Sequence, residues 1–442
     1  MAARAAASRQ NTMSTVLVMG AGYVGLPTAA CFAHLGHDVV CCDVDEAKIA
    51  HLRHGDVRVL EEGLPELVAE GLESGRLTFE AAPAVEAAQA EFVFLCLPTP
   101  EGAEGAADLS YVETAARMLA PSLRADAIVV TKSTMPVGSA SRVRQMLADA
   151  GAPPDVRVVV NPEFLREGHA VEEFLEPHRI VIGADEELAA TRVAALYRTI
   201  DAPIVLADPR SAELIKYASN AFLATKISFV NELANACEAV GADIVEVVRG
   251  LGEDPRIGFG WLTAGPGWGG PCFPKDAAAL LRSTADAGYE FELLRCAVEV
   301  NQRQRQRVVE KVRAACAGLP SPAVVAVWGL TFKAGTDDVR HSPAVEVARL
   351  LASQGLVVRA FDPAYRGGTQ PDLDGIEIAA DAYDACAGAG VLVVLTEWED
   401  FTKLDLSRVA AQMAGRCIVD TRNLLDPEQV RNAGFEYWGT GR

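Results

Sequence analysis

The sequence predicts an α/β protein in which two Rossmann-like, doubly wound lobes are joined by a helical middle domain with a long central helix. Three observations predict this fold. Short apolar, β-branched runs alternate with helical patterns between residue 15 and about residue 205. A helical pattern without Gly or Pro then runs from Ser211 to about Val240, and the alternation restarts at Val324. Strands that alternate with helices are typical of parallel sheets.

In the first lobe, the runs Thr15–Met19 and Val39–Cys42 flank a helical pattern that continues through His34, which predicts one βαβ unit. Further buried strands are predicted at 92–97, 128–131, 156–160 and 180–182. Residues 256–276 are rich in Gly and Pro and predict an ordered loop, followed by a helix over 292–316. In the second lobe, the predicted elements are strands at 324–328, 357–361, 390–395 and 417–419 and a helix at 343–353.

These elements predict four parts of the chain: a flexible tail over 1–12, a first Rossmann-like domain over 13–205, a helical central and dimerisation domain over 206–318 and a second, smaller Rossmann-like domain over 319–442. A helix as long as 211–240 usually links domains or forms a subunit interface.

Composition narrows the class of protein. The chain has 442 residues with 40 Lys and Arg against 60 Asp and Glu, a formal net charge of −20. This balance argues against a nucleic-acid or anionic-membrane partner. The ten cysteines are scattered and form no CxxC pair, so a reducing, cytoplasmic location is expected and no metal site is predicted.

A glycine motif, Gly20-Ala21-Gly22-Tyr23-Val24-Gly25, follows the first strand and opens a helix. Gly20 allows the tight turn, Gly22 lets the backbone approach a pyrophosphate, and Gly25 allows close packing of helix and strand. Asp43 ends the second strand, where a carboxylate can accept both ribose hydroxyls and repel a 2′-phosphate. The motif predicts NAD, with Asp43 as a simple helix cap as the alternative.

Three further positions are candidates for cofactor contacts. Lys48 can reach the adenosine side, although a solvated lysine fits the pattern nearly as well. Thr99 and Thr134 each follow a predicted strand, and open α/β sheets bind ligands at the carboxyl ends of their strands. Turn capping is the alternative for both threonines.

The most informative stretch is Gly265-Pro266-Gly267-Trp268-Gly269-Gly270-Pro271-Cys272-Phe273-Pro274-Lys275-Asp276. Its glycines allow the backbone to crowd a ligand, and Cys272 has a Lys-Asp pair nearby, which makes it a candidate nucleophile. Seven other cysteines lie in mostly apolar surroundings and are predicted to be core residues: Cys31, Cys41, Cys42, Cys96, Cys237, Cys296 and Cys417.

Two further segments carry polar side chains that are expected to face a cleft. The run 161–168 follows a strand and carries the carboxylate of Glu167. On the middle helix, Lys216 and Asn220 share one face at a spacing of four, where they could hold an oxyanion and a water. The alternative is an exposed helix face on which Lys216 pairs with Glu213.

Taken in order, these motifs resemble the UDP-glucose/GDP-mannose dehydrogenase family over nearly the whole chain. The resemblance also rests on five further runs, at 107–110, 177–180, 254–258, 331–340 and 396–401. It implies oxidation of the primary alcohol of UDP-glucose to the carboxylate of UDP-glucuronate with two NAD⁺, through a thiohemiacetal and a thioester on Cys272.

The resemblance also implies roles for domains and residues: residues 13–205 bind NAD, and residues 319–442 bind the UDP-sugar. Lys216 stabilises oxyanions, Asn220 positions the sugar, and Asp276 supports proton transfer with a bound water. Glu167 is the base for hydrolysis, with Thr134 orienting its water. The implied NAD contacts are Val24, Asp43, Lys48, Thr99, Thr134, Glu167, Lys275 and Arg340. The implied sugar-nucleotide contacts are Glu163, Phe164, Leu165, Arg166, Glu167, Lys216, Asn220, Trp261, Leu262, Thr263, Ala264, Gly265, Gly269 and Lys333. Arg256 is expected to reach the site of a second subunit, with a homodimer formed through the central helix.

Three alternatives remain open at this stage. The same chemistry could act on GDP-mannose or on a UDP-N-acetylhexosamine. A two-electron dehydrogenase of the β-hydroxyacid kind would share the glycine-rich lobe but need no cysteine. An NAD-binding scaffold without turnover is the non-enzymatic reading.

Overall fold

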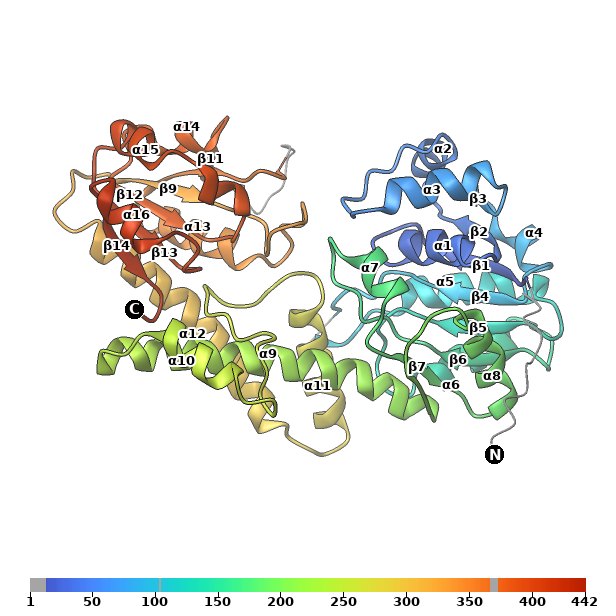
Figure 1. The fold of residues 1–442 in the computed structure, drawn as a ribbon. Helices are drawn as coiled ribbons and strands as arrows, with labels where there is room; N and C mark the ends of the chain where they lie inside the picture. Colours follow the sequence, from blue (N-terminus) through green and yellow to red (C-terminus); the bar gives the residue numbers. More distant parts are fainter. Residues whose placement is uncertain (1–12, 103–104, 366–372) are drawn as a thin grey trace, which may run out of the picture. The chain divides into compact units, whose positions relative to one another are not determined.

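The computed structural model describes residues 13–102, 105–365 and 373–442. The chain divides into two compact units, one up to Tyr217 and the other from Ala218 onward. The predicted tail over 1–12 lies outside the described residues. Figure 1 colours the two units along the chain, with α9 as one continuous helix in green.

The first unit is built on an eight-stranded sheet with the order β3-β2-β1-β4-β5-β6-β7-β8. All neighbouring strands pair in parallel except β6 and β7, which meet in a single antiparallel pair, Val160 with Gly183. The strands are β1 (Thr15–Met19), β2 (Asp38–Cys42), β3 (Leu77–Glu80), β4 (Phe92–Leu95), β5 (Ile128–Thr131), β6 (Arg157–Val160), β7 (Ile180–Gly183) and β8 (Ile204–Ala207).

Helices cover both faces of this sheet, because alternate residues of the strands are apolar on both sides. Val16 and Val18 of β1 pack into one core, while Leu17 and Met19 pack into the other. The first core holds α1 (Gly25–His34), α2 (Glu46–Arg53), α3 (Leu64–Glu73), α7 (Ala170–Leu175) and α8 (Glu187–Leu196). The second holds α4 (Pro83–Ala87), α5 (Ser110–Leu119), η2 (Ala120–Ser122) and α6 (Ser139–Asp149).

A helical segment follows, starting with α9 (Pro209–Val240), which belongs to both units. It continues with α10 (Ile244–Gly252), α11 (Phe273–Asp286) and α12 (Glu292–Ala315). The side chain of Asp243 caps α10 by accepting a hydrogen bond from Val245 N. The predicted loop over 256–276 extends too far toward the C-terminus. Phe273 already begins α11, with Pro274 in its first turn.

The second unit contains a six-stranded, fully parallel sheet with the order β11-β10-β9-β12-β13-β14. This is the doubly wound order of dinucleotide-binding folds. Its strands are β9 (Val324–Trp328), β10 (Val357–Phe361), β11 (Ile376–Ile378), β12 (Val391–Val394), β13 (Cys417–Asp420) and β14 (Glu436–Gly439). The remaining helices are α13 (Pro343–Ser353), α14 (Ala382–Cys386), η4 (Glu399–Lys403), α15 (Leu406–Gln412) and α16 (Pro427–Asn432).

The predicted fold class is confirmed, and the predicted strands agree with the structure to within about two residues. The prediction missed β3, β8, β11 and β14, which are the outermost strands of the two sheets. Three of these edge strands interrupt their apolar residues with polar ones, as in Leu77–Glu80 of β3. The fourth, β8, is an apolar run, but its Ile204, Val205 and Leu206 are exposed at the edge of the sheet. Among the described residues, no helix combines the length and hydropathy needed to cross a membrane.

Candidate active site

The glycine turn after β1 is formed by close backbone contacts. Gly20 has a φ of +100°, and a Cβ there would clash with the carbonyl of Cys96. A Cβ at Gly25 would clash with the Gly20 carbonyl. A Cβ at Gly22 would meet no atom within 4 Å. The fold therefore requires glycine at positions 20 and 25. The space at Gly22 is open and lies beside the start of α1, where Val24 is the N-cap residue.

Asp43 closes the site at the end of β2. Its Oδ2 accepts from Ala21 N at 2.9 Å and from Lys48 Nζ at 3.0 Å. Burial alone would raise the pKa of Asp43, but these donors and Asp45 N outweigh it and the pKa is lowered. Asp43 does not cap a helix, because Asp45 caps α2. Lys48 is ion-paired with Asp43 rather than simply solvated.

These residues fit NAD. An open glycine turn at a helix N-terminus suits a pyrophosphate, and an ionised carboxylate at the second strand end suits a ribose diol and disfavours a 2′-phosphate. The site lies where β1 and β4 are neighbours but not consecutive, the switch point at which open sheets bind ligands.

The structure brings Thr99 and Thr134 together at this edge of the sheet. Thr99 Oγ1 donates to the Thr134 carbonyl at 2.8 Å, and both residues are buried. Thr99 follows β4 and Thr134 follows β5. Their contact shows that the two predicted cofactor positions belong to one local structure.

The segment after β6 carries a buried ion pair. Glu163 Oε1 lies 2.9 Å from Lys216 Nζ, and Glu163 Oε2 accepts from Leu165 N at 2.7 Å. Burial would raise the pKa of Glu163, but the ammonium of Lys216 outweighs it and the pKa is lowered. Phe164 places its ring 5.5 Å from Lys216 Nζ.

The alternative of an exposed Lys216–Glu213 helix face is wrong. Lys216 is 3% exposed and Glu213 is 4% exposed. Glu213 accepts from Gly138 N and Ala140 N instead, which satisfies donors at the N-terminus of α6.

Glu167 is half-buried and lies between Arg166, which is exposed and paired with Glu173, and Gly168. Gly168 N and Ala170 N donate to the two carboxylate oxygens of Glu61 at 2.7 and 2.9 Å. Glu61 therefore fixes the backbone that carries Glu167. Sequence reasoning missed Glu61, because a buried glutamate 107 residues away leaves no local pattern.

Cys272 is the N-cap residue of α11 and is partly exposed. The helix macrodipole stabilises negative charge at such a position. One turn later, Asp276 is 1% exposed, and its carboxylate accepts from Asn220 Nδ2 and from Lys275 Nζ, both at 2.6 Å. The predicted set of Asn220, Cys272, Lys275 and Asp276 therefore forms one connected group between α9 and α11.

The loop before Cys272 is held by buried amides. Asn301 accepts from Trp268 N at 2.8 Å and donates to the Trp268 carbonyl at 2.9 Å. Gly265 N donates to Asn231 Oδ1, and the Gly265 carbonyl accepts from Gln304 Nε2. In the run 261–265, Leu262 and Ala264 are buried and Trp261 and Thr263 are exposed; Gly269 has no room for a Cβ beside the His341 carbonyl.

The second sheet repeats the arrangement of the first with a difference. Asp362, after β10, accepts from Leu330 N and Thr331 N, as Asp43 accepts from Ala21 N. It also accepts from Trp398 Nε1 at 3.1 Å. Because the indole covers this carboxylate, the second lobe cannot offer it to a ribose.

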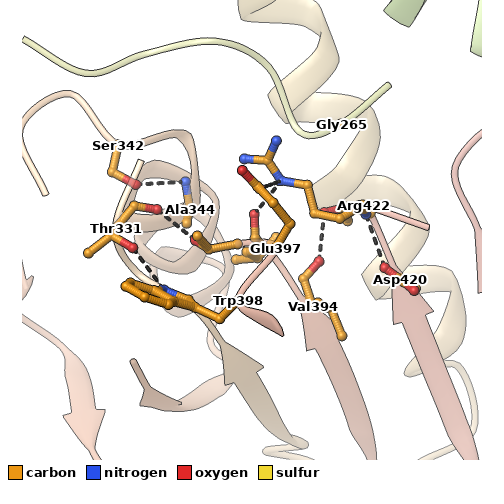
Figure 2. Close-up of polar contacts among 12 residues, drawn as sticks. Gly265, Thr331, Ser342, Ala344, Val394, Glu397, Trp398, Asp420 and Arg422 are labelled. Carbon is orange, nitrogen blue, oxygen red and sulfur yellow. Dashed lines mark hydrogen bonds and ion pairs between the residues drawn. The ribbon is translucent and has the colours of Figure 1, made fainter. Parts of the chain in front are cut away.

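Arg422 extends from the end of β13 toward the loop at Gly265 (Figure 2). Its Nε donates to the Leu395 carbonyl at 2.8 Å and lies 3.0 Å from Glu397 Oε2. Sequence reasoning missed Arg422, although it follows a predicted strand end, the signal used for Thr99. Lys333 lies over the Phe332 ring, and Arg340 is paired with Asp338.

The cysteines predicted to be core residues are buried, with one exception. Burial raises the pKa of Cys31, Cys42, Cys96 and Cys417 to about 12, so these thiols stay protonated. Cys296 was predicted to be a core residue, and this is wrong: it is exposed. Its neighbour Ala297 takes the buried position on α12, and Cys296 lies about 100° away around the helix. In the described ranges, no group of His, Cys, Asp or Glu side chains is arranged to hold a metal ion.

The geometry defines a two-lobed, dinucleotide-binding oxidoreductase with a cysteine at a helix N-terminus. Family models of the UDP-glucose/GDP-mannose dehydrogenase family match residues 14–201 as the NAD binding domain, 210–303 as the central domain and 326–427 as the UDP binding domain. The chain belongs to this family, its cofactor is NAD, and its small-molecule partner is a nucleotide sugar.

Individual relatives agree with this family. A UDP-glucose 6-dehydrogenase of Rhizobium meliloti is 44% identical over 433 residues, 97% of this chain and 99% of that protein. One of Pseudomonas aeruginosa is 42% identical, covering 96% and 97%. The solved UDP-glucose dehydrogenase of Pyrobaculum islandicum is 37% identical with a TM-score of 0.90, covering 98% and 99%.

The glycine turn yields a test that separates folding from cofactor binding. We expect Gly25→Ala to lower the free energy of unfolding by about 1–3 kcal/mol, because its methyl group clashes with the Gly20 carbonyl. Gly22→Ala should fold normally, since its methyl group meets open space, yet weaken NAD binding by obstructing the pyrophosphate. Urea unfolding and NAD titration measure the two effects. Unchanged NAD affinity in Gly22→Ala would contradict the assignment of this turn.

Proposed function

We propose that the protein oxidises UDP-glucose to UDP-glucuronate in two successive oxidations through a covalent intermediate on Cys272. The observation that carries the proposal is the position of Cys272 as the N-cap of α11, one turn before an Asp276 carboxylate that binds Asn220 and Lys275. The similarity to relatives named UDP-glucose 6-dehydrogenase at 37–44% identity supports this substrate.

When bound, NAD⁺ accepts a hydride from C6 of the sugar in each oxidation. After the first oxidation, the Cys272 thiolate adds to the aldehyde carbon and forms a C–S bond, which gives a thiohemiacetal and holds the aldehyde in place. The second oxidation converts this adduct into a thioester. Water then adds to the thioester carbon, the C–S bond breaks, and the carboxylate leaves while the sulfur returns as thiolate.

The polar residues have complementary roles in this proposal. The Lys216 ammonium stabilises the oxyanion of the adducts, and it lies one turn of α9 before Asn220. Asn220 and Asp276 position the sugar and a water for proton transfer. Glu167 removes a proton from the hydrolytic water, which Thr134 orients. Lys275 and Arg340 contact NAD together with Val24, Asp43, Lys48 and Thr99.

The nucleotide part of the substrate is proposed to bind the second lobe and the loops beside it. The contacts are Glu163 to Glu167, the run 261–265, Gly269 and Lys333. We add Arg422, because its guanidinium lies at the carboxyl end of β13 near Gly265, where a cation suits a pyrophosphate.

We also propose that α9 forms a homodimer with a second copy of the chain. Phe222 and Phe229, two turns apart on α9, are 68% and 59% exposed, which is unusual for phenylalanine. Lys226 of α9 donates to the Ile257 carbonyl, so the neighbouring Arg256 lies at the rim of this face with its side chain largely exposed. A partner on α9 would therefore meet Arg256.

Three alternatives concern the chemistry. The same reactions on GDP-mannose or on a UDP-N-acetylhexosamine fit the family, and a solved UDP-D-ManNAc dehydrogenase of Pyrococcus horikoshii is 29% identical with a TM-score of 0.86. The two-electron dehydrogenase and the inactive scaffold leave the Cys272 group without a role. We also propose a cytoplasmic location, because the scattered cysteines without a CxxC pair are typical of a reducing compartment.

A panel of nucleotide sugars tests the substrate. With NAD⁺, we expect turnover of UDP-glucose and two NADH per sugar, because the aldehyde stays bound between oxidations. Absorbance at the NADH band and product analysis measure both. Turnover restricted to GDP-mannose would show that GDP-mannose, and not UDP-glucose, is the substrate. One NADH per sugar would favour the two-electron dehydrogenase.

Cys272→Ala tests the covalent step. Without the sulfur, no thioester can form, so uronate formation should fall by at least about a hundredfold, while NAD affinity and thermal stability stay near those of the unmodified protein. Cys296→Ala, at an exposed cysteine remote from the loop in sequence, is the matched control and should keep full activity. Normal uronate production by Cys272→Ala would contradict the mechanism.

Mixed dimers test the role of Arg256. Arg256→Ala and Cys272→Ala should each be nearly inactive alone, yet co-expression should restore about a quarter of the activity, because half of randomly formed dimers carry one intact site. Phe229→Glu should abolish the dimer in analytical ultracentrifugation. No recovery in the co-expressed pair would place Arg256 in the site of its own chain.

A further inference from the structure

Lys132, the first residue after β5, is a buried lysine that the proposed chemistry leaves unused. It is 4% exposed, and its Nζ lies 3.3 Å from Asn161 Oδ1 and 3.4 Å from Tyr197 Oη. The rings of Phe174 and Tyr197 lie 5.7 and 5.8 Å from the same atom. These partners are all neutral, and among the described residues no carboxylate lies within ion-pair distance of Lys132.

The surroundings of Lys132 contain one carboxylate and one further ammonium. The titratable groups that face it come from five segments: Cys31 of α1, Cys96 after β4, Glu163 after β6, Tyr197 after α8 and Lys216 of α9. Burial raises the pKa of Cys31 and Cys96 to about 12, and it raises that of Tyr197 as well. These three groups are therefore neutral near pH 7.

The charged groups among these are Lys132, Glu163 and Lys216, two ammonium groups and one carboxylate. Burial lowers the pKa of Lys132 to about 8, although Cys96 and Glu163 oppose this change. A buried, uncompensated charge is unfavourable unless an opposite charge arrives. Here Glu163 is shared between two ammonium groups, because Lys216 and Lys132 both lower its pKa.

Glu163 alone would cancel much of the attraction that Lys216 has for an anion, because the two groups are 2.9 Å apart. We propose that Lys132 is a positioning residue whose ammonium offsets Glu163, so that Lys216 keeps its attraction for the oxyanion. This inference rests on the proposed function, in which Lys216 stabilises that oxyanion. Lys132 acts through Glu163 and Lys216 and does not itself touch the substrate.

Lys132 also bonds to Asn161, the residue that begins the segment carrying Glu163 and Glu167. Asn161 is held independently, because its Nδ2 donates to the Val181 carbonyl at 2.9 Å and its Oδ1 accepts from Tyr197 Oη at 2.5 Å. Loss of the lysine therefore leaves Asn161 with partners. A test must separate the charge of Lys132 from its packing.

The pH dependence of kcat separates the effect of the charge of Lys132 from the effect of its packing. Wild-type kcat should fall above about pH 8, where Lys132 loses its proton. Lys132→Met should lower kcat at pH 7 by about ten- to a hundredfold, remove that fall and leave the KM for NAD⁺ within twofold. Lys132→Arg keeps its charge at every tested pH, so it should restore most of the rate and hold it through pH 9.

Two outcomes would overturn the proposal. One is a Lys132→Met enzyme with normal kcat or with the fall near pH 8 intact. The other is an equal loss in Lys132→Met and Lys132→Arg, which would assign the residue a structural role. The assay uses whichever nucleotide sugar the wild-type enzyme turns over, so a wrong substrate in the proposed function is recognised separately by the wild-type panel.

Thermal unfolding gives a readout that needs no activity. The pKa of Lys132 is about 8 in the folded chain against an ordinary value of 10.5, so the unfolded chain binds more protons between these values. Wild-type stability therefore gains with pH in this window, and Lys132→Met lacks that gain. The Tm of Lys132→Met minus that of wild type should be highest below pH 8 and shrink toward pH 10. A constant difference would contradict a charged, buried Lys132.

Discussion

The buried carboxylate of Asp276 is the constraint on which the candidate nucleophile depends. It accepts from Asn220 on α9 and from Lys275 on its own helix, and Asp276 N donates to the Cys272 carbonyl in the first turn of α11. One carboxylate thus ties the helix that begins at Cys272 to the long central helix. Because an unpaired buried carboxylate would be costly, its two donors and the position of the helix are mutually dependent.

Helix α9 owes its role to an inverted amphipathic pattern. Its buried face carries a polar stripe at successive spacings of three, four, eight and three: Glu213, Lys216, Asn220, Ser228 and Asn231. Each of these side chains binds a different segment: the start of α6, Glu163, Asp276, α12 and the loop at Gly265. The phenylalanines lie on the exposed face instead. Within the first unit the helix thus holds Glu163 and the start of α6, and within the second it holds Asp276, α12 and the loop at Gly265.

Much of this could be predicted from the sequence, because parallel strands are short apolar runs and glycine turns have a fixed spacing. Thr15–Met19 and Val324–Trp328 were predicted to the residue. The failures have physical causes. Periodicity on α9 suggested an exposed Lys216–Glu213 pair, since polar stripes usually face water. Glu61 and Asn301 act over long distances in sequence, so no local pattern marks them, whereas Arg422 follows a strand end and could have been found. Cys272 was found because its glycine-rich context is local, but its place as a helix N-cap required the structure.

The hydrogen bond from the Trp398 indole to Asp362 affects which lobe can bind a dinucleotide. Two lobes of the same topology, each with an acid at the second strand end, would compete for the abundant dinucleotide of the cell. By occupying Asp362, the indole withdraws one of them from that competition. Selectivity between the lobes is thus built into a single aromatic side chain rather than left to relative concentrations.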